Sequence, residues 1–275
     1  MSNKPLHGKT ILITGASRGI GREIAIRCAK DGANLILGAK TLEPDPKLPG
    51  TLLSVAKEVE DAGGRAVPVK VDVRDEAQVH EMVEKGAREF GGIDALINNA
   101  GAIFLAGTAE TPMKRFDLMH QVNVRAVFLC TQACLPYLKQ SENAHVINLS
   151  PPFSLDTKWY AGHLGYSLSK YGMTLCTLGM AAEFKPFKIS VNSLWPRKII
   201  GTAATKMLLG EQGLTAARLP AIMADAAYEI LTTPAMKLTG QTLIDEDFLK
   251  TRGVTDFKRY ACKPGVEALP DLFVD

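Results

Sequence analysis

Cysteine is scarce in this 275-residue chain, and spacings typical of metal ligands are absent. Its five cysteines include no Cys-x-x-Cys pair, and the count is odd. Four of them fall in apolar stretches, where a buried thiol is the ordinary expectation: Cys28, Cys130, Cys134 and Cys176. These features predict a reducing compartment without a disulfide framework. The five histidines are scattered, so no metal site is predicted.

Long apolar runs and dense blocks of one charge are also missing. Residues 1–9 are polar and lack the apolar core of a secretory signal, and no run approaches membrane-spanning length. The last residues, Phe273-Val274-Asp275, are not a peroxisomal address. The net charge is only +3, and its lysines and arginines are dispersed. We therefore expect a soluble cytoplasmic protein that acts on a small molecule, with neither nucleic acid nor membrane as a partner.

The chain does contain short apolar runs that alternate with longer amphipathic ones. Seven runs are rich in Val, Ile and Leu: Thr10–Thr14, Asn34–Ala39, Ala66–Val71, Ala95–Ile97, His145–Leu149, Ile189–Leu194 and Thr242–Asp245. They lack strict alternation, as is typical of strands covered on both faces. The pattern predicts an α/β protein with a doubly wound Rossmann fold, a seven-stranded parallel sheet and helices on both faces. No linker is evident, so one domain is expected over residues 1–275.

The stretches between these runs predict five helices: Ile20–Asp31, Leu52–Ala62, Glu76–Phe90, Pro112–Leu138 and Leu164–Phe184. Glycine pairs at 63–64 and 91–92 provide stop signals. Asp72 and Asp75 are candidate N-caps of the third helix. Thr41–Gly50 contains three prolines and predicts a rigid loop rather than a domain boundary.

A glycine-rich segment, Thr14-Gly15-Ala16-Ser17-Arg18-Gly19-Ile20-Gly21, directly follows the first expected strand and opens a helix. In such a segment Gly15 permits a tight turn, Gly19 lets the backbone approach phosphate, and Gly21 lets helix and strand pack closely. The helix N-terminus offers free N–H groups and a positive dipole to a pyrophosphate. An ordinary glycine-rich turn is the alternative. The position between strand and helix favours a dinucleotide site that includes Ser17 and Ile20.

The end of the second expected strand carries no acid. A carboxylate there would hold the ribose 2′-OH of NAD, but Gly38-Ala39-Lys40-Thr41 has none before Glu43. Lys40 can pair with a 2′-phosphate, and Arg18 offers a second cation. Each alone is more often a solvated surface residue. Two cations without an acid predict NADP(H) as the cofactor.

Three further motifs follow in order: Asn98-Asn99-Ala100-Gly101, then Asn123, then Tyr166-Ser167-Leu168-Ser169-Lys170. Together with the glycine loop they resemble the short-chain dehydrogenase/reductase family, over essentially the whole chain. A Tyr-x-x-x-Lys element alone carries little information, whereas four motifs in order are specific. Segments such as Ser150-Pro151-Pro152 resemble the hydroxysteroid dehydrogenase-like branch of that family. Its larger members carry a sterol-carrier-like domain downstream, so this chain would correspond to the dehydrogenase part alone.

The resemblance implies more cofactor contacts: Asp72, Val73, Asn99, Ala100, Gly101, Pro196 and Thr202. Asp72 would lie at the adenine amino group, although a helix N-cap is the alternative. Thr202 would lie near the nicotinamide carboxamide. The family's usual Pro-Gly is Pro196-Arg197 here, and the spacing to Thr202 is longer.

Tyr166 and Lys170 are four residues apart in an expected helix, so their side chains share a face. Free tyrosine has a pKa near ~10, and a neighbouring ammonium lowers it. Tyr166 is therefore predicted to protonate a carbonyl as hydride arrives from NADPH, or to act in reverse. The resemblance implies that Lys170 bonds the nicotinamide ribose and that Asn123 holds a water linking Lys170 to solvent. The alternative is an amphipathic helix face with a snorkelling lysine.

A serine that the family places after the fifth strand, where it bonds the substrate oxygen, is missing. Alignment on Asn148 puts Pro151 there, and proline donates no hydrogen bond. Ser150 is the best substitute, and Ser154 and His163 are poorer ones. Losing one such donor typically costs about 10²–10³ in rate. An oxidoreductase remains the favoured interpretation. A non-catalytic NADP(H)-binding regulatory protein is the alternative, and lyase or epimerase chemistry is a minor third.

The substrate side is apolar, with six candidate pocket residues: Pro151, Phe153, Trp159, Tyr160, Leu164 and Trp195. Such residues are more often core. If they line a pocket, the substrate is a lipid-like or bulky apolar carbonyl compound or alcohol. Met207–Leu219 is a candidate lid. The resemblance also implies a homodimer or homotetramer that forms through helices Pro112–Leu138 and Leu164–Phe184.

Overall fold

A single seven-stranded sheet organises the computed structural model, which describes residues 4–43 and 50–274. The strands are β1 (Thr10–Thr14), β2 (Asn34–Ala39), β3 (Arg65–Lys70), β4 (Ala95–Asn98), β5 (His145–Asn148), β6 (Ser190–Trp195) and β7 (Thr242–Ile244). Each lies within one residue of the run that predicted it. All pairings are parallel, in the order β3-β2-β1-β4-β5-β6-β7. The predicted doubly wound Rossmann fold is confirmed.

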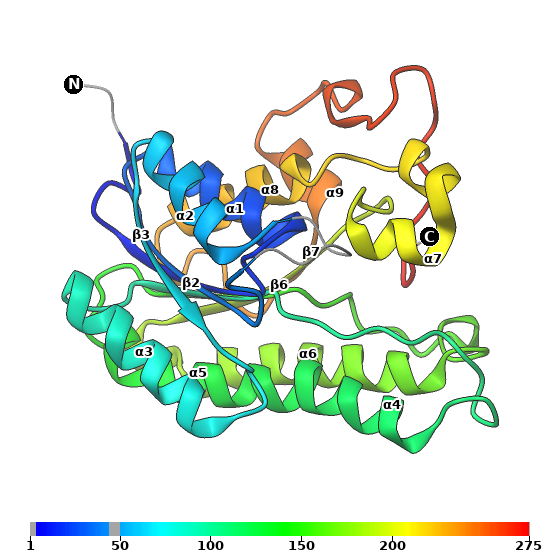
Figure 1. Cartoon of the computed structure of the whole chain (residues 1–275), viewed down its shortest axis with the longest axis horizontal. Coiled ribbons are helices and arrows are strands. Elements are labelled where there is room, and N and C mark those ends of the chain that lie inside the picture. The colour runs from blue at the N-terminus through cyan, green and yellow to red at the C-terminus, as the bar shows by residue number, and fades with distance from the viewer. Residues whose placement is uncertain (1–3, 44–49, 275) are drawn as a thin grey trace.

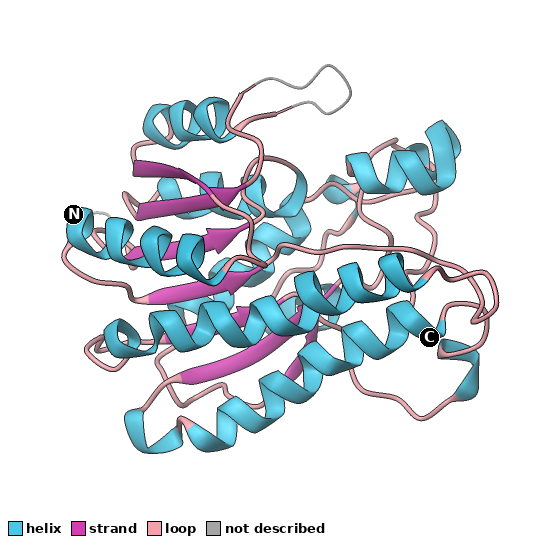
Figure 2. Ribbon diagram, turned by 60° about the horizontal axis from the view of Figure 1, so that its bottom comes forward, coloured by secondary structure: helices cyan, strands magenta, loops and turns pink. Residues whose placement is uncertain are grey.

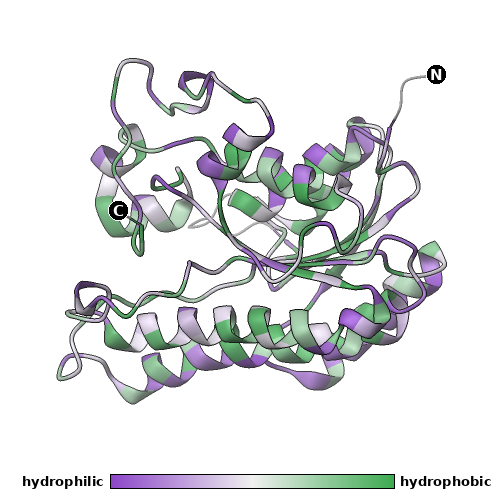
Figure 3. Ribbon diagram, turned by 180° about the vertical axis from the view of Figure 1, so that it is seen from behind, coloured by the Kyte–Doolittle hydropathy of each residue, from purple (hydrophilic) through white to green (hydrophobic). Residues whose placement is uncertain are grey.

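Helices cover both faces of this sheet (Figure 1). One face carries α1 (Gly19–Ala29), α2 (Leu52–Asp61), α8 (Ala221–Thr232) and α9 (Asp245–Thr251). The other carries α3 (Glu76–Phe90), α4 (Met113–Met119), α5 (Ala126–Leu138) and α6 (Leu164–Glu183). A separate apolar cluster fills each interface between sheet and helices. The strands and the helix sides that face them are largely apolar in Figure 3, as burial on both faces requires.

The N-terminus of α1 differs from those of α2 and α3 in having no side-chain cap. Thr51 and Ser54 form a capping box at α2, and Asp75 accepts a hydrogen bond from the Gln78 amide at α3. Asp75, rather than Asp72, is therefore the N-cap of that helix. The N-terminus of α1 has no capping side chain, since Arg18 makes no such bond there. Its first N–H groups remain available to a ligand.

The helix expected over Pro112–Leu138 is divided into three parts. A π-helical turn, His120–Arg125, joins α4 to α5. It adds one residue to the turn, and such turns are frequent at functional sites. Asn123 lies within it and is fully buried.

The sheet order reverses between β1 and β4, because the chain runs outward from β1 to β3 and then returns. Ligands of open α/β sheets bind outside the carboxyl ends of the strands at this switch point. The strand arrows in Figure 2 point toward the side of the molecule that carries α7 (Ala203–Thr215). The candidate site is therefore expected between α7 and these strand ends.

His145 is the first residue of β5, at the end of the strand away from the candidate site. We expect it to make the stability of the fold sensitive to acid. Its Nε2 lies 3.0 Å from the Thr233 carbonyl oxygen, whereas its buried Nδ1 has no partner among the described residues. Burial lowers the pKa of His145 from 6.5 to about 4. The unfolded chain takes up this proton below pH 6.5 while the native imidazole stays neutral. The stability present above pH 6.5 is thus lost as the pH falls toward 4, by up to about 3 kcal/mol.

Urea unfolding at pH 7 and pH 5 measures this loss. We expect wild type to lose about 2 kcal/mol more than His145→Gln between these pH values. The exposed His80 supplies the control, because His80→Gln should retain the wild-type pH dependence. Equal losses in wild type and His145→Gln would show that His145 does not carry the effect.

Candidate active site

Two glycines of the loop between β1 and α1, Gly15 and Gly21, leave no room for a Cβ. Gly15 has φ +68°, and a Cβ there would lie 2.9 Å from the Ala100 Cα. A Cβ on Gly21 would lie 2.5 Å from the Asn99 Nδ2 and 2.7 Å from the Gly15 oxygen. A Cβ on Gly19 would approach the Thr202 methyl carbon to 3.4 Å. The loop is thus held between two segments predicted to contact the cofactor.

Asn99 fixes the glycine loop to the end of β4. Its Nδ2 donates to the carbonyl oxygens of Thr14 and Gly15, at 2.9 and 3.1 Å. In return, the Thr14 hydroxyl accepts from the amides of Asn99 and Ala100, both at 3.1 Å. These four bonds make the Asn-Asn-Ala-Gly segment the support of the turn that would approach a phosphate.

A cavity of about 590 Å³ opens at these strand ends. Seven predicted site residues line it: Ile20, Asn99, Gly101, Tyr166, Lys170, Pro196 and Thr202. The other predicted residues are not among its lining: Gly15, Ser17, Arg18, Gly19, Gly21, Lys40, Asp72, Val73, Ala100, Asn123 and Ser150. Leu208 and Leu209 of α7 also line it, which agrees with the place expected for a lid. That helix begins earlier than the predicted lid and ends at Thr215.

Tyr166 and Lys170 enter this cavity from α6, and both are more than nine-tenths buried. The Lys170 Nζ donates to the Leu149 carbonyl oxygen at 2.8 Å and lies 5.0 Å from the Trp195 ring centroid. Burial lowers the pKa of Lys170 to about 8. At neutral pH the ammonium therefore still predominates.

The expected lowering of the Tyr166 pKa is wrong for this state of the protein. Burial raises the pKa of Tyr166 well above its ordinary value, and the carboxylate of Asp271 adds to the rise. The Lys170 ammonium is directed to a backbone carbonyl instead of the phenol. Tyr166 thus keeps its proton at neutral pH, which suits the donation of a proton to a carbonyl.

Asn123 uses its side chain to join the loop after β4 to α6. Its Oδ1 accepts from the Ala102 amide at 2.8 Å, and its Nδ2 donates to the Ala102 carbonyl and the Ser169 hydroxyl, both at 2.9 Å. Ser169 directly precedes Lys170. Asn123 therefore positions the helix that carries the lysine, and its proposed water-holding role stays a prediction.

Ser150 does not lie in the cavity wall, where Leu149 takes its place. Its buried hydroxyl has no hydrogen-bond partner among the described residues. The Pro151 carbonyl accepts from the Thr174 hydroxyl at 2.7 Å, behind the wall. Besides Tyr166, the hydroxyl-bearing residues of the described lining are threonines, at positions 202 and 205. None of the three predicted substitutes for the missing serine lines the described cavity: Ser150, Ser154 and His163.

The apolar pocket prediction is correct for two residues and wrong for four. Trp159 and Trp195 line the cavity, whereas the remaining four candidates do not: Pro151, Phe153, Tyr160 and Leu164. The rings of Phe153 and Tyr160 pack instead against Tyr171, at centroid distances of 5.1 and 5.5 Å.

A model of the short-chain dehydrogenase family matches residues 9–212. The chain belongs to this family. It is 52% identical over 270 residues to hydroxysteroid dehydrogenase-like protein 2 of Danio rerio. The alignment covers 98% of this chain and 65% of that protein. The branch expected from the sequence motifs is thus confirmed. The chain spans slightly less than two thirds of the length of this relative.

Two solved structures share the fold closely. A protein of Xanthomonas campestris described as a dehydrogenase is 52% identical, with a TM-score of 0.95 over 98% of this chain and 99% of that one. A short chain dehydrogenase of Mycobacterium thermoresistibile is 48% identical, with a TM-score of 0.93 over 98% and 96% of the two chains. Members of this family bind nicotinamide cofactors, and the residues at the end of β2 bear on which one.

Lys40, at the end of β2, forms an ion pair with Asp72, with 2.8 Å between Nζ and Oδ2. Arg74 holds the same carboxylate through Nε and Nη2, at 3.0 and 2.6 Å. The guanidinium of Arg74, followed by Lys40, keeps the pKa of Asp72 well below its usual range. Because Arg74 already pairs with Asp72, Lys40 can turn to a phosphate without leaving that carboxylate unpaired. Arg18 lies at the same edge and donates to the Gly50 carbonyl at 3.0 Å.

The C-terminal segment is a part of the candidate site that the sequence did not predict. Pro270, Asp271, Leu272 and Val274 line the cavity. The Trp195 Nε1 donates to the Leu272 carbonyl oxygen at 2.8 Å. No motif marks this segment. The short apolar run at residues 272–274 is a signal that could have indicated it.

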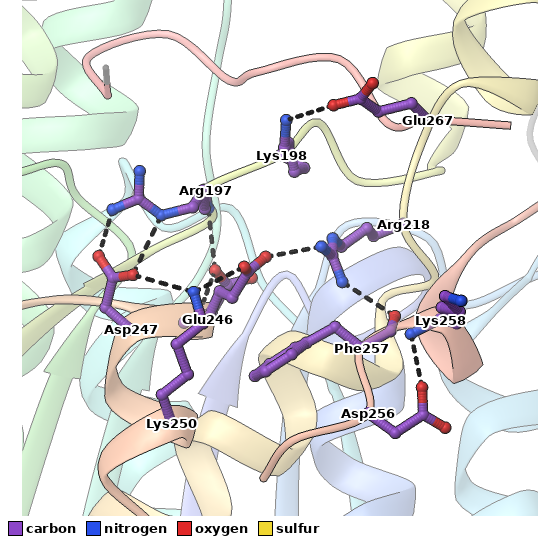
Figure 4. A network of polar contacts seen from close by, with 11 residues as sticks. Arg197, Lys198, Arg218, Glu246, Asp247, Lys250, Asp256, Phe257, Lys258 and Glu267 are labelled. Carbon is purple, nitrogen blue, oxygen red and sulfur yellow. Dashed lines mark hydrogen bonds and ion pairs between the residues drawn. The ribbon is translucent and has the colours of Figure 1, made fainter.

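A polar network supports this side of the cavity (Figure 4). Arg218 pairs with Glu246 at 2.6 Å, and both side chains are largely buried. Arg218 also donates to the Phe257 carbonyl oxygen at 3.0 Å, and Arg197 pairs with Asp247. The network thus joins the segments before and after α7 to α9 and to the chain beyond it.

No described helix is both long enough and apolar enough to cross a membrane. Residues 4–43 and 50–274 also contain no group of three or more His, Cys, Asp or Glu side chains placed to hold a metal ion.

Proposed function

We propose that this chain is an NADP(H)-dependent oxidoreductase that interconverts a carbonyl and a secondary alcohol, with Tyr166 as acid and base. One observation carries the proposal. Tyr166 and Lys170 lie together in a cavity that also reaches Asn99 and Thr202 beside the glycine loop. The dinucleotide and the reacting carbonyl would therefore meet at one place.

The residues present fit a dinucleotide. The uncapped N-terminus of α1 offers N–H groups to a pyrophosphate, and the glycines of the loop place no side chain between the backbone and a ligand. A bound nicotinamide would supply or accept the hydride. In the direction of reduction, Tyr166 would give its proton to the carbonyl oxygen, and the new C–H and O–H bonds would complete the alcohol. The charge of Lys170 stabilises the resulting phenolate.

The cavity wall supports a bulky, apolar substrate. Among its lining residues, Ile103, Leu105, Trp159, Leu208 and Leu209 present apolar surface. Apolar walls with few polar groups are typical of sites that bury most of a ligand. The name of the Danio rerio relative suggests hydroxysteroids as one class to include in a substrate panel.

A non-catalytic NADP(H)-binding protein is the second candidate function. It is favoured by Ser150, which lies outside the cavity lining, and by Pro151 at the position of the family's serine. The two functions differ in hydride transfer. The test follows the absorbance of NADPH during incubation with a panel of bulky ketones. The Tyr166→Phe variant gives the background rate. NADPH oxidation above this background supports the oxidoreductase, and its absence supports the non-catalytic protein.

Lys40→Ala should lower NADPH affinity about 10- to 100-fold and leave NADH affinity within about twofold. A charge-assisted bond to the 2′-phosphate would be lost, and such bonds are worth about 1.5–3 kcal/mol. Titration of both nucleotides by calorimetry measures the change. Lys57→Ala is the control, because Lys57 is exposed and pairs with Asp61 on α2. Equal loss of both nucleotides, or none, would remove Lys40 from cofactor choice.

We also propose that the chain forms a homodimer or homotetramer through α5 and α6. Large apolar side chains stand exposed on both helices, including Phe128 at 55% and Leu175 at 57%. Leu168 and Leu178 extend this surface along α6. Exposed apolar patches of this kind are typical of protein interfaces.

A further inference from the structure

Asp271 is the one acidic residue of the described cavity lining. It comes from the C-terminal segment and is partly buried. The lining residues nearest to it in the chain, Leu272 and Val274, are apolar. Ile199, which is also apolar, lies beside this segment, because its amide donates to the Leu269 carbonyl oxygen. A carboxyl group in such a wall is costly unless something bonds to it.

The backbone around Asp271 is held firmly. Its amide donates to the Arg197 carbonyl at 3.1 Å, and the Ile199 amide donates to the Leu269 carbonyl at 3.0 Å. The Phe273 ring, two residues on, packs in the aromatic cluster 6.1 Å from Tyr166, centroid to centroid. The segment is therefore a fixed wall of the site.

The side chain of Asp271 is only partly satisfied by the protein. One carboxylate oxygen accepts from the Leu272 amide at 2.7 Å. No lysine or arginine among the described residues forms an ion pair with it. Its charge nevertheless acts on the site. It adds to the rise that burial causes in the pKa of Tyr166, and it opposes the lowering that burial causes in the pKa of Lys170. Burial in turn raises the pKa of Asp271 to about 7.

We propose that Asp271 is a substrate-recognition residue, which selects carbonyl compounds that carry a hydroxyl or N–H group near the reacting carbon. This inference rests on the proposed oxidoreductase function. A donor on the substrate supplies the bond that the protein leaves unmade. A ligand that covers Asp271 without such a donor removes the carboxyl group from water and leaves one of its oxygens unpaired, and sites of this kind discriminate strongly against such analogues.

The test compares undecan-2-one with its 4-hydroxy and 6-hydroxy derivatives. We expect wild type to prefer one hydroxylated ketone by at least about tenfold in kcat/KM. Asp271→Leu should reduce that preference to within about twofold while the parent ketone is still turned over. Asp271→Asn, which keeps an acceptor, should retain part of it. Glu267→Gln is the control, because Glu267 lies in the same segment and is exposed.

Three outcomes would overturn the proposal: no preference in wild type, an unchanged preference in Asp271→Leu, or an equal loss on all three ketones in that variant. The last would make Asp271 a positioning residue for the Tyr166–Lys170 pair. If no ketone reacts at all, the proposed function fails but the inference is still tested. The chain has two tryptophans, Trp159 and Trp195, and both line the cavity. Quenching of their fluorescence reports binding of each ketone without turnover, and it should show the same preference and the same loss.

Discussion

Tyr166→Phe is expected to lower the rate of carbonyl reduction by at least about 10³-fold while NADPH binds as in wild type. General acid catalysis typically contributes about 10²–10⁴-fold, and phenylalanine removes the proton donor alone. The phenyl ring can keep its packing against Phe273, and the bond from Lys170 to the Leu149 carbonyl does not involve the phenol. Steady-state NADPH oxidation with a bulky ketone measures the rate, and a nucleotide titration measures binding.

The matched control is Tyr160→Phe. Tyr160 lies in the neighbouring loop, outside the cavity lining, and its hydroxyl donates to the Ser154 carbonyl at 2.5 Å. Its loss should change the rate by no more than a few fold. If Tyr166→Phe keeps more than about a tenth of the wild-type rate, the phenol is not the acid. If both variants and wild type bind NADPH but reduce no ketone, the non-catalytic function is favoured.

The fold was predictable because its signals are local. Strands buried on both faces require continuous apolar runs, so the runs beginning at Thr10 and Asn34 gave the observed bounds of β1 and β2. The helix over Pro112–Leu138 was predicted as one piece, and the π-helical turn within it was missed. That turn inserts one residue into the backbone pattern without changing apolar spacing enough to be seen in a sequence.

The candidate site was predictable where a motif fixes both residue type and position. Gly21, Asn99 and Lys170 were found in this way, because close packing or charge requires those residues at those points. Asp271 was missed since it reaches the cavity only after the chain has folded back from α9. The raised pKa of Tyr166 was missed for the same reason: it depends on burial and on a carboxylate 105 residues away in the chain.

Gly21→Ala is expected to abolish tight NADPH binding and to lower the free energy of unfolding by about 1–3 kcal/mol. The new methyl carbon would lie 2.5 Å from the Asn99 Nδ2 and 2.7 Å from the Gly15 oxygen, so one of them must move. Neither can move freely, because Asn99 donates to both Thr14 and Gly15. Overpacking of this kind typically costs that much. It also displaces the loop and the helix end that would receive the pyrophosphate.

Gly179→Ala is the matched control, since it makes the same chemical change within α6. Within one copy of the chain, a Cβ there meets no atom within 4 Å, and the residue is exposed. Alanine in a helix interior should therefore stabilise the protein by about 0.5–1 kcal/mol. Urea unfolding and nucleotide titration of both variants separate the effects. A Gly21→Ala protein that binds NADPH like wild type would show that the loop tolerates displacement, and that the glycine pattern is not what holds the dinucleotide. A variant that is destabilised yet still binds would assign Gly21 to helix packing alone.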